Sequence, residues 1–97
     1  MQTINTQALA AEYAEIILSG KLRAIMAVRY YGECVVQKRQ IRSDRVESFY
    51  ESMKSVLAEP YRTTLSHMSS RERLAVEQAV AVNVYEAIQD LMIGCIR

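Results

Sequence analysis

Residues that interrupt helices are scarce in this chain. It contains one proline and three glycines among 97 residues. A fold built from many short strands needs frequent turns, and turns depend heavily on glycine and proline. The scarcity therefore argues against an all-β fold. Residue types that favour helices, such as alanine, glutamate, leucine and arginine, are plentiful.

The clearest helical pattern lies in residues 44–58. Asp44 and Glu47 approximate a capping box at its start. Glu59-Pro60 is expected to stop this helix, because the residue before a proline avoids the helical conformation. The apolar residues recur at helical spacing, and the charged residues lie on the opposite face of the predicted helix. The apolar residues are Val46, Phe49, Tyr50, Met53, Val56 and Leu57.

A second amphipathic helix is predicted at residues 6–19. Asn5 or Thr6 can cap its start, since both side chains accept hydrogen bonds from free backbone N–H groups. Gly20 follows at the place where a helix commonly ends in a glycine.

The last predicted helix covers residues 70–95. Ser69 and Glu72 form a capping box at its start. Apolar residues occupy an unusually wide part of its circumference. Such a stripe predicts a central helix, or a helix that also packs against another chain.

The segment 21–41 permits two interpretations. Arg29 and Glu33 form an i, i+4 pair, which favours a helix and requires Gly32 to sit in its middle. A mid-helix glycine costs about 1 kcal/mol and is tolerable where a neighbouring helix packs closely. The alternative is an α+β fold with a hairpin at about 26–39, turning at Gly32-Glu33. Neither face of that hairpin is cleanly apolar, so the helix is preferred.

Together these segments predict one all-α domain over residues 1–97, a compact bundle of four to five helices. Its length suits a single domain with its own core. The expected helices are 6–19, 21–41, 44–58 and 70–95, with a short helical turn near 62–67.

Composition and the N-terminal sequence favour a cytoplasmic protein. The chain is 51% apolar and 24% charged, as in ordinary globular domains. It shows no secretory signal and no apolar run of membrane-spanning length, so no membrane contact is expected. Cys34 and Cys95 are expected to be reduced thiols, with a disulfide between them left open.

Positive charge gathers in one part of the sequence. Net charge is only +1, yet residues 21–45 carry seven basic and two acidic side chains. Possible phosphate contacts are Lys38, Arg39, Arg42 and Arg45, and the neighbouring Tyr30 and Tyr31 could stack on bases. The spacing fits no helix-turn-helix. Basic residues near the C-terminus of one helix and acidic residues near the N-terminus of the next are both stabilised by the helix dipoles. We therefore interpret the segment mainly as a junction between two helices, and secondarily as a nucleic-acid-binding surface.

No catalytic or metal-binding pattern is visible. His67 is the only histidine and is expected to be exposed or to cap a helix. One histidine and two distant cysteines do not form a recognisable zinc site. The sequence also lacks a glycine-rich phosphate loop and a nucleophile elbow. We therefore expect no enzyme activity, no metal and no cofactor.

Tyrosine usage points to protein contacts. The chain has six tyrosines, one phenylalanine and no tryptophan, and tyrosine is enriched at interfaces. We expect a small non-enzymatic protein that acts through protein–protein contacts, as an adaptor, inhibitor or regulatory subunit, and that can form a homodimer. The alternative is a nucleic-acid-binding regulator that uses residues 38–45. The expected partner contacts are Tyr30, Tyr31, Tyr85, Ile93 and Ile96.

Overall fold

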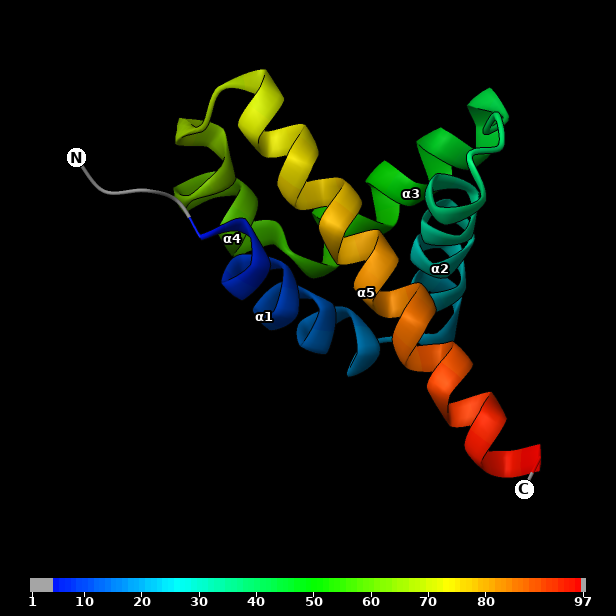
Figure 1. Cartoon of the computed structure of the whole chain (residues 1–97). Helices are drawn as coiled ribbons and strands as arrows, with labels where there is room; N and C mark the ends of the chain where they lie inside the picture. Colours follow the sequence, from blue (N-terminus) through cyan, green and yellow to red (C-terminus); the bar gives the residue numbers. More distant parts are fainter. Residues whose placement is uncertain (1–4, 97) are drawn as a thin grey trace.

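The computed structural model describes the backbone of residues 5–96 and the side chains of residues 5–91. Within residues 5–96 it holds five α-helices, one 3-10 turn and no β-strand, which confirms the all-α prediction. The elements are α1 (Thr6–Leu18), α2 (Leu22–Gln37), α3 (Ser43–Val56), α4 (Ala58–Thr63), η1 (Leu65–His67) and α5 (Ser70–Ile96) (Figure 1).

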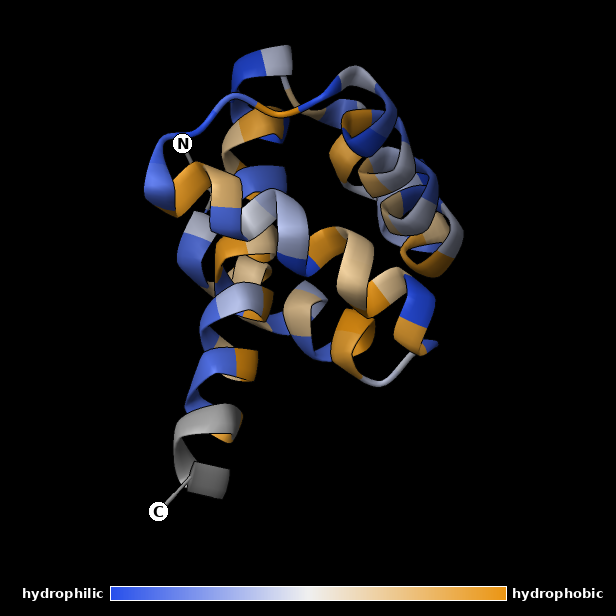
Figure 2. Cartoon of the chain, turned by 90° about the vertical axis from the view of Figure 1, so that its right-hand side faces the viewer, coloured by the Kyte–Doolittle hydropathy of each residue, from blue (hydrophilic) through white to orange (hydrophobic). Residues whose placement is uncertain are grey.

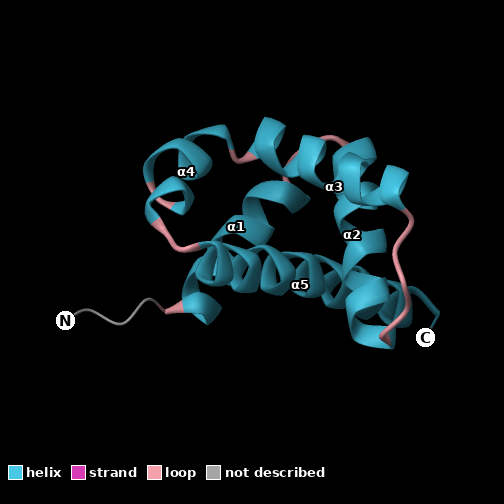
Figure 3. Ribbon diagram, turned by 90° about the horizontal axis from the view of Figure 1, so that it is seen from above, coloured by secondary structure: helices cyan, strands magenta, loops and turns pink. Residues whose placement is uncertain are grey.

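Helix α5 is the central element of the bundle. Both α1 and α2 pack against it, and α3 packs on α2 (Figure 1). Seen from above, α5 runs along the length of the molecule, with α3 and α4 on one side of it (Figure 3). This position explains the wide apolar stripe of its sequence, because two helices cover α5 at once. Its buried apolar residues are Val76, Val80, Ala81, Val84 and Tyr85.

Helix α2 is continuous through Gly32, so the hairpin alternative is wrong. A β-carbon at position 32 would overlap the backbone carbonyl of Ala81 and lie 3.0 Å from the β-carbon of Tyr85. Glycine therefore allows the two helix backbones to meet here. The predicted pair is also present, with Arg29 Nη1 3.5 Å from Glu33 Oε2.

Helix α2 ends four residues earlier than expected. Lys38 adopts a left-handed conformation with φ 56°. The N–H of Arg39 donates to the Cys34 carbonyl at 2.9 Å, and the N–H of Lys38 donates to the Val35 carbonyl at 3.3 Å. This pair of bonds is the Schellman arrangement, which closes the helix at Gln37 and leaves residues 38–42 as a connection.

Two of the predicted helix caps are present. The Asn5 side chain accepts a hydrogen bond from the Ala8 N–H at 3.0 Å. Ser69 and Glu72 each accept from the other's backbone N–H at 3.2 Å, which completes the capping box. Gly20 follows α1 as expected, but its backbone is not left-handed.

The start of α3 differs from the prediction. The capping position is Arg42, whose side chain makes no capping bond, and Asp44 lies inside the first turn. Asp44 instead pairs with Arg42, at 3.3 Å between Oδ2 and Nη2. It still places negative charge at the positive end of the helix dipole, so its electrostatic effect is retained without the capping bond.

Pro60 does not terminate α3, contrary to expectation. The chain turns earlier, at Leu57, whose φ of −103° and ψ of 40° interrupt the helix. Pro60 is the third residue of α4 and Glu59 is helical. A proline is tolerated in the first helical turn because the N–H it lacks would have no partner within the helix. The helical turn expected near 62–67 is present as η1 and the end of α4.

The buried apolar side chains form one cluster drawn from α1, α2, α3, η1 and α5. At its centre the ring of Phe49 stacks on that of Tyr31, with ring centroids 3.9 Å apart and an interplanar angle of 13°. Ile17 and Leu65 are fully buried beside other core residues. The core thus fixes α3 to α2 through an aromatic pair.

Candidate functional site

Two of the tyrosines expected at a partner interface lie in the core instead. Tyr31 is 7% exposed and Tyr85 is 6% exposed. The guanidinium of Arg29 lies 5.5 Å from the centroid of the Tyr85 ring. The Tyr85 hydroxyl accepts a hydrogen bond from Gln89 at 2.8 Å. These rings bury apolar area inside the bundle, and the assignment of Tyr31 and Tyr85 to a contact surface is corrected.

Tyr30 is half-buried at the surface between α2 and α3. The Arg45 guanidinium lies 5.3 Å from the centroid of its ring. The other two expected partner contacts, Ile93 and Ile96, lie outside the residues whose side chains the structure describes.

The end of α5 extends away from the bundle. Ile88 packs against the core as a partly buried residue, whereas Gln89, Asp90 and Leu91 are exposed. Leu91 is 68% exposed. Figures 1 and 2 show this part of the helix clear of its neighbours. We call residues 89–96 the projecting end of α5; their sequence is Q-D-L-M-I-G-C-I.

The basic segment is fully on the surface. Lys38, Arg39, Arg42 and Arg45 are all exposed. Arg39 lies 3.5 Å from Glu33, and Arg42 is held by Asp44. Exposed ion pairs of this kind contribute little stability, so the guanidinium groups can exchange partners at small cost.

A groove adjoins the basic segment, between α2 and α3. Its volume is about 690 Å³, and Arg23, Arg29, Tyr30 and Arg45 are among the side chains that line it. Glu51 lies on the same groove and offsets part of its positive charge. The basic surface therefore reaches beyond residues 38–45.

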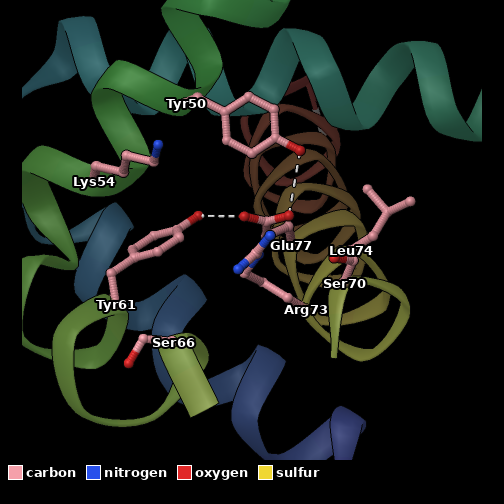
Figure 4. A pocket seen from close by; sticks show the side chains of 8 residues that line it. All are labelled: Tyr50, Lys54, Tyr61, Ser66, Ser70, Arg73, Leu74 and Glu77. Carbon is pink, nitrogen blue, oxygen red and sulfur yellow. Dashed lines mark hydrogen bonds between the residues drawn. The ribbon is translucent and has the colours of Figure 1, made fainter. Parts of the chain in front are cut away.

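The most developed polar site lies elsewhere, around Glu77 of α5. Glu77 is 3% exposed and is the one buried charged residue among the described side chains. The Tyr61 hydroxyl donates to Glu77 Oε2 at 2.8 Å, and the Tyr50 hydroxyl donates to Oε1 at 3.2 Å. Each carboxylate oxygen thus has a donor, as a buried charge requires. Figure 4 shows the two rings converging on Glu77 from α3 and α4.

Both tyrosines are poor acids in this site, because they are partly buried and lie beside a carboxylate. Burial, reinforced by the negative charge of Glu77, raises the pKa of Tyr50 to about 12. Burial and the hydrogen bond to Glu77 raise the pKa of Tyr61 well above its ordinary value. Both hydroxyls therefore keep their protons and act as donors across the physiological pH range.

Glu77 forms the floor of a pocket of about 500 Å³ between α3, α4 and α5. Lys54 and Arg73 line the pocket as well, together with the hydroxyls of Ser66 and Ser70. The Lys54 ammonium lies 5.9 Å from the centroid of the Tyr50 ring. We call this cavity the Glu77 pocket.

Glu77 was not among the residues predicted to form a site. A signal was present, since Glu77 lies on the same helical face as Val80, Ala81 and Val84, within the apolar stripe. An acid on an apolar stripe predicts a buried carboxylate with donors near it. What the sequence does not reveal is which donors, because Tyr50 and Tyr61 come from two other helices.

The remaining reactive side chains form no site in the described part of the chain. His67 is exposed, as expected, and Cys34 is a buried free thiol. The described residues contain no group of three histidine, cysteine, aspartate or glutamate side chains that could hold a metal ion. Within the same residues, no helix combines the length and apolarity of a membrane span.

Comparisons with protein-family models, with curated proteins and with solved structures find no significant match to this chain.

Proposed function

We propose that this is a small non-enzymatic cytoplasmic protein that acts through protein–protein contacts, as an adaptor, inhibitor or regulatory subunit. The observation that carries the proposal is the projecting end of α5, where Leu91 is 68% exposed. Burying a leucine side chain contributes about 1.5–3 kcal/mol, so a partner that covers this end would gain by removing Leu91 from water.

A second copy of the chain is the partner we propose first. The last six residues of the projecting end are residues 91–96, and all of them except Gly94 are apolar. A two-fold contact uses the same patch on both copies, so one apolar helix end suffices to form it.

Light scattering coupled to size exclusion tests the homodimer. The wild-type chain of 11.1 kDa is expected to elute with twice its monomer mass, and Leu91→Glu is expected to elute as a monomer. Leu22→Glu is the matched control, because Leu22 is similarly exposed, at 72%, but lies at the start of α2. The proposal would be contradicted if the wild-type chain were a monomer at all concentrations. It would also be contradicted if Leu91→Glu and Leu22→Glu converted the dimer to monomer to the same extent.

The groove beside the basic segment favours a second candidate, a nucleic-acid-binding regulator. Arg45 beside the ring of Tyr30 is an arrangement that could hold a phosphate next to a stacked base. Binding to Lys38, Arg39 and Arg42 would weaken steeply with salt.

A mobility-shift assay tests this candidate. Replacement of Lys38, Arg39 and Arg42 by alanine is expected to abolish the shift of a short oligonucleotide. Replacement of the exposed Arg62 and Arg71 is the control, since both lie outside the groove and the basic segment. The absence of any shift at low salt, or an equal loss in the control, would rule it out.

A further inference from the structure

The Glu77 pocket has an arrangement of charge that neither proposed function uses. Its floor is a carboxylate whose two oxygens already accept hydrogen bonds from Tyr61 and Tyr50. Around that floor lie two cations, Lys54 and Arg73. With one negative and two positive groups, the lining carries a net charge of +1.

The two cations have no ion-pair partner among the described residues. The ion pairs of that part of the chain involve Arg29, Arg39, Arg42 and Arg62. Lys54 is exposed and Arg73 is half-buried, so both can reach a ligand in the pocket. In Figure 4 the Lys54 ammonium lies between the rings of Tyr50 and Tyr61, and the Arg73 guanidinium lies beside Glu77 on the opposite side of the pocket.

One hydroxyl adds to this donor set and another does not. Ser66 donates to the Arg62 carbonyl at 2.7 Å, so its proton is already used. The Ser70 side chain makes no hydrogen bond within the described residues, and it lines the same pocket as Arg73. The available donors are therefore an ammonium, a guanidinium and a hydroxyl.

These donors favour an anionic ligand that has several acceptor oxygens. A guanidinium and an ammonium together offer more N–H groups than one carboxylate can accept, whereas a phosphate has three or four acceptor oxygens. A cationic ligand would approach Glu77 past two positive side chains and find both of its oxygens hydrogen-bonded. The volume of about 500 Å³ suits a small molecule.

From these contacts we infer that the Glu77 pocket binds a phosphate group, with Arg73 and Lys54 as its charged ligands and Ser70 as a further donor. In this arrangement Glu77 is a positioning residue. It holds Tyr50 and Tyr61 and so sets the walls between which the phosphate lies. The phosphate could be the free ion or part of a small organic phosphate.

Titration of the 97-residue chain by NMR tests the inference. Sodium phosphate is added at constant ionic strength, with sodium chloride as the reference, and glucose 6-phosphate forms a second arm. Backbone signals of Arg73, Ser70 and Lys54 are expected to shift with saturation. Tighter binding of glucose 6-phosphate would identify an organic phosphate as the ligand, and equal or weaker binding would identify the free ion.

Three variants make the test specific. Arg73→Gln and Lys54→Gln are each expected to weaken phosphate binding about tenfold or more, because each removes a charge-assisted contact. Arg71→Gln is the control: Arg71 is an exposed cation on the same turn of α5 that does not line the pocket. It is expected to leave binding within about twofold of wild type, as for other exposed charges.

Three results would overturn the inference. The first is the absence of saturable shifts with either phosphate. The second is an equal loss of affinity in Arg71→Gln and Arg73→Gln, which would show a general effect of surface charge. The third is binding of choline chloride at the pocket without binding of phosphate, which would identify Glu77 as the anchor of an ammonium ligand. Circular dichroism of each variant confirms that a loss of binding is not a loss of fold.

Discussion

Gly32 of α2 and Ala81 of α5 bring their backbones so close that no side chain fits between them. The contact lies at the crossing of the two helices that share the largest interface in the bundle. A glycine within a helix is less stable than an alanine at the same position. The close packing of α2 against α5 compensates for this lost stability.

Gly32→Ala is therefore expected to destabilise the protein. The added β-carbon meets backbone atoms of Ala81, which cannot move aside as a flexible side chain can. We expect a loss of about 1–3 kcal/mol in the free energy of unfolding, despite the better helix propensity of alanine. Urea unfolding followed by circular dichroism measures it.

Gly20→Ala provides the control for this prediction. A β-carbon at Gly20 would lie 3.3 Å from the Ile17 carbonyl oxygen, and its other neighbours lie at ordinary contact distances. We expect a change within about 0.5 kcal/mol. If both variants unfold at the same urea concentration, the crossing at Gly32 is not the cause.

Removal of the Tyr61 hydroxyl is expected to cost more than removal of the Tyr50 hydroxyl. Tyr61→Phe leaves Glu77 Oε2 without its 2.8 Å donor in a buried place. A hydrogen bond to a charged group contributes about 1.5–3 kcal/mol, and we expect a loss of that size. The Tyr50 bond is longer, at 3.2 Å, so Tyr50→Phe is expected to lose less.

Tyr30→Phe is the matched control, since the Tyr30 hydroxyl makes no hydrogen bond within the described residues. It is expected to unfold within about 0.5 kcal/mol of wild type. A loss in Tyr30→Phe as large as that in Tyr61→Phe would mean that ring packing, and not the bond to Glu77, determines the result.

Stability is expected to fall as the pH rises above about 10. In the unfolded chain a tyrosine titrates near pH 10, whereas in the folded protein the pKa of Tyr50 is about 12 and that of Tyr61 is also raised. Above pH 10 the unfolded state therefore gives up protons that the folded state retains. The contribution of Tyr50 is complete below pH 10 and is lost between about pH 10 and 12, whereas that of Tyr61 is lost only at still higher pH.

Urea midpoints at pH 9 and pH 11 measure this loss. The double variant Tyr50→Phe, Tyr61→Phe is expected to show a smaller fall between the two pH values than wild type, whereas Tyr30→Phe keeps the full fall. An identical fall in wild type and the double variant would show that other groups, such as lysines, govern the alkaline transition.

The helices of the fold were predictable because their signals are local. The apolar spacing of residues 44–58, the Asn5 cap and the Ser69–Glu72 box each act within one or two turns of chain. The helix at Gly32 was also predictable once the ion pair of Arg29 and Glu33 was weighed against a poor hairpin.

Features that depend on distant residues were not predictable in the same way. Tyr31 was expected at an interface because tyrosine is common there, but Phe49 from another helix covers its ring. Pro60 was expected to stop a helix, and only the turn at Leu57 reveals that a new helix has already begun. Glu77 gave a local signal of burial, while its partners Tyr50 and Tyr61 became evident only in three dimensions.

The central position of α5 has a consequence for how the chain is made. The helices that pack against it, α1 and α2, precede it in the sequence, and α5 begins only at Ser70. On the ribosome their apolar faces must remain uncovered until α5, which follows them in the sequence, has been synthesised. The nascent chain thus passes through a stage in which helices are present without a core, when chaperones or premature association can intercept it.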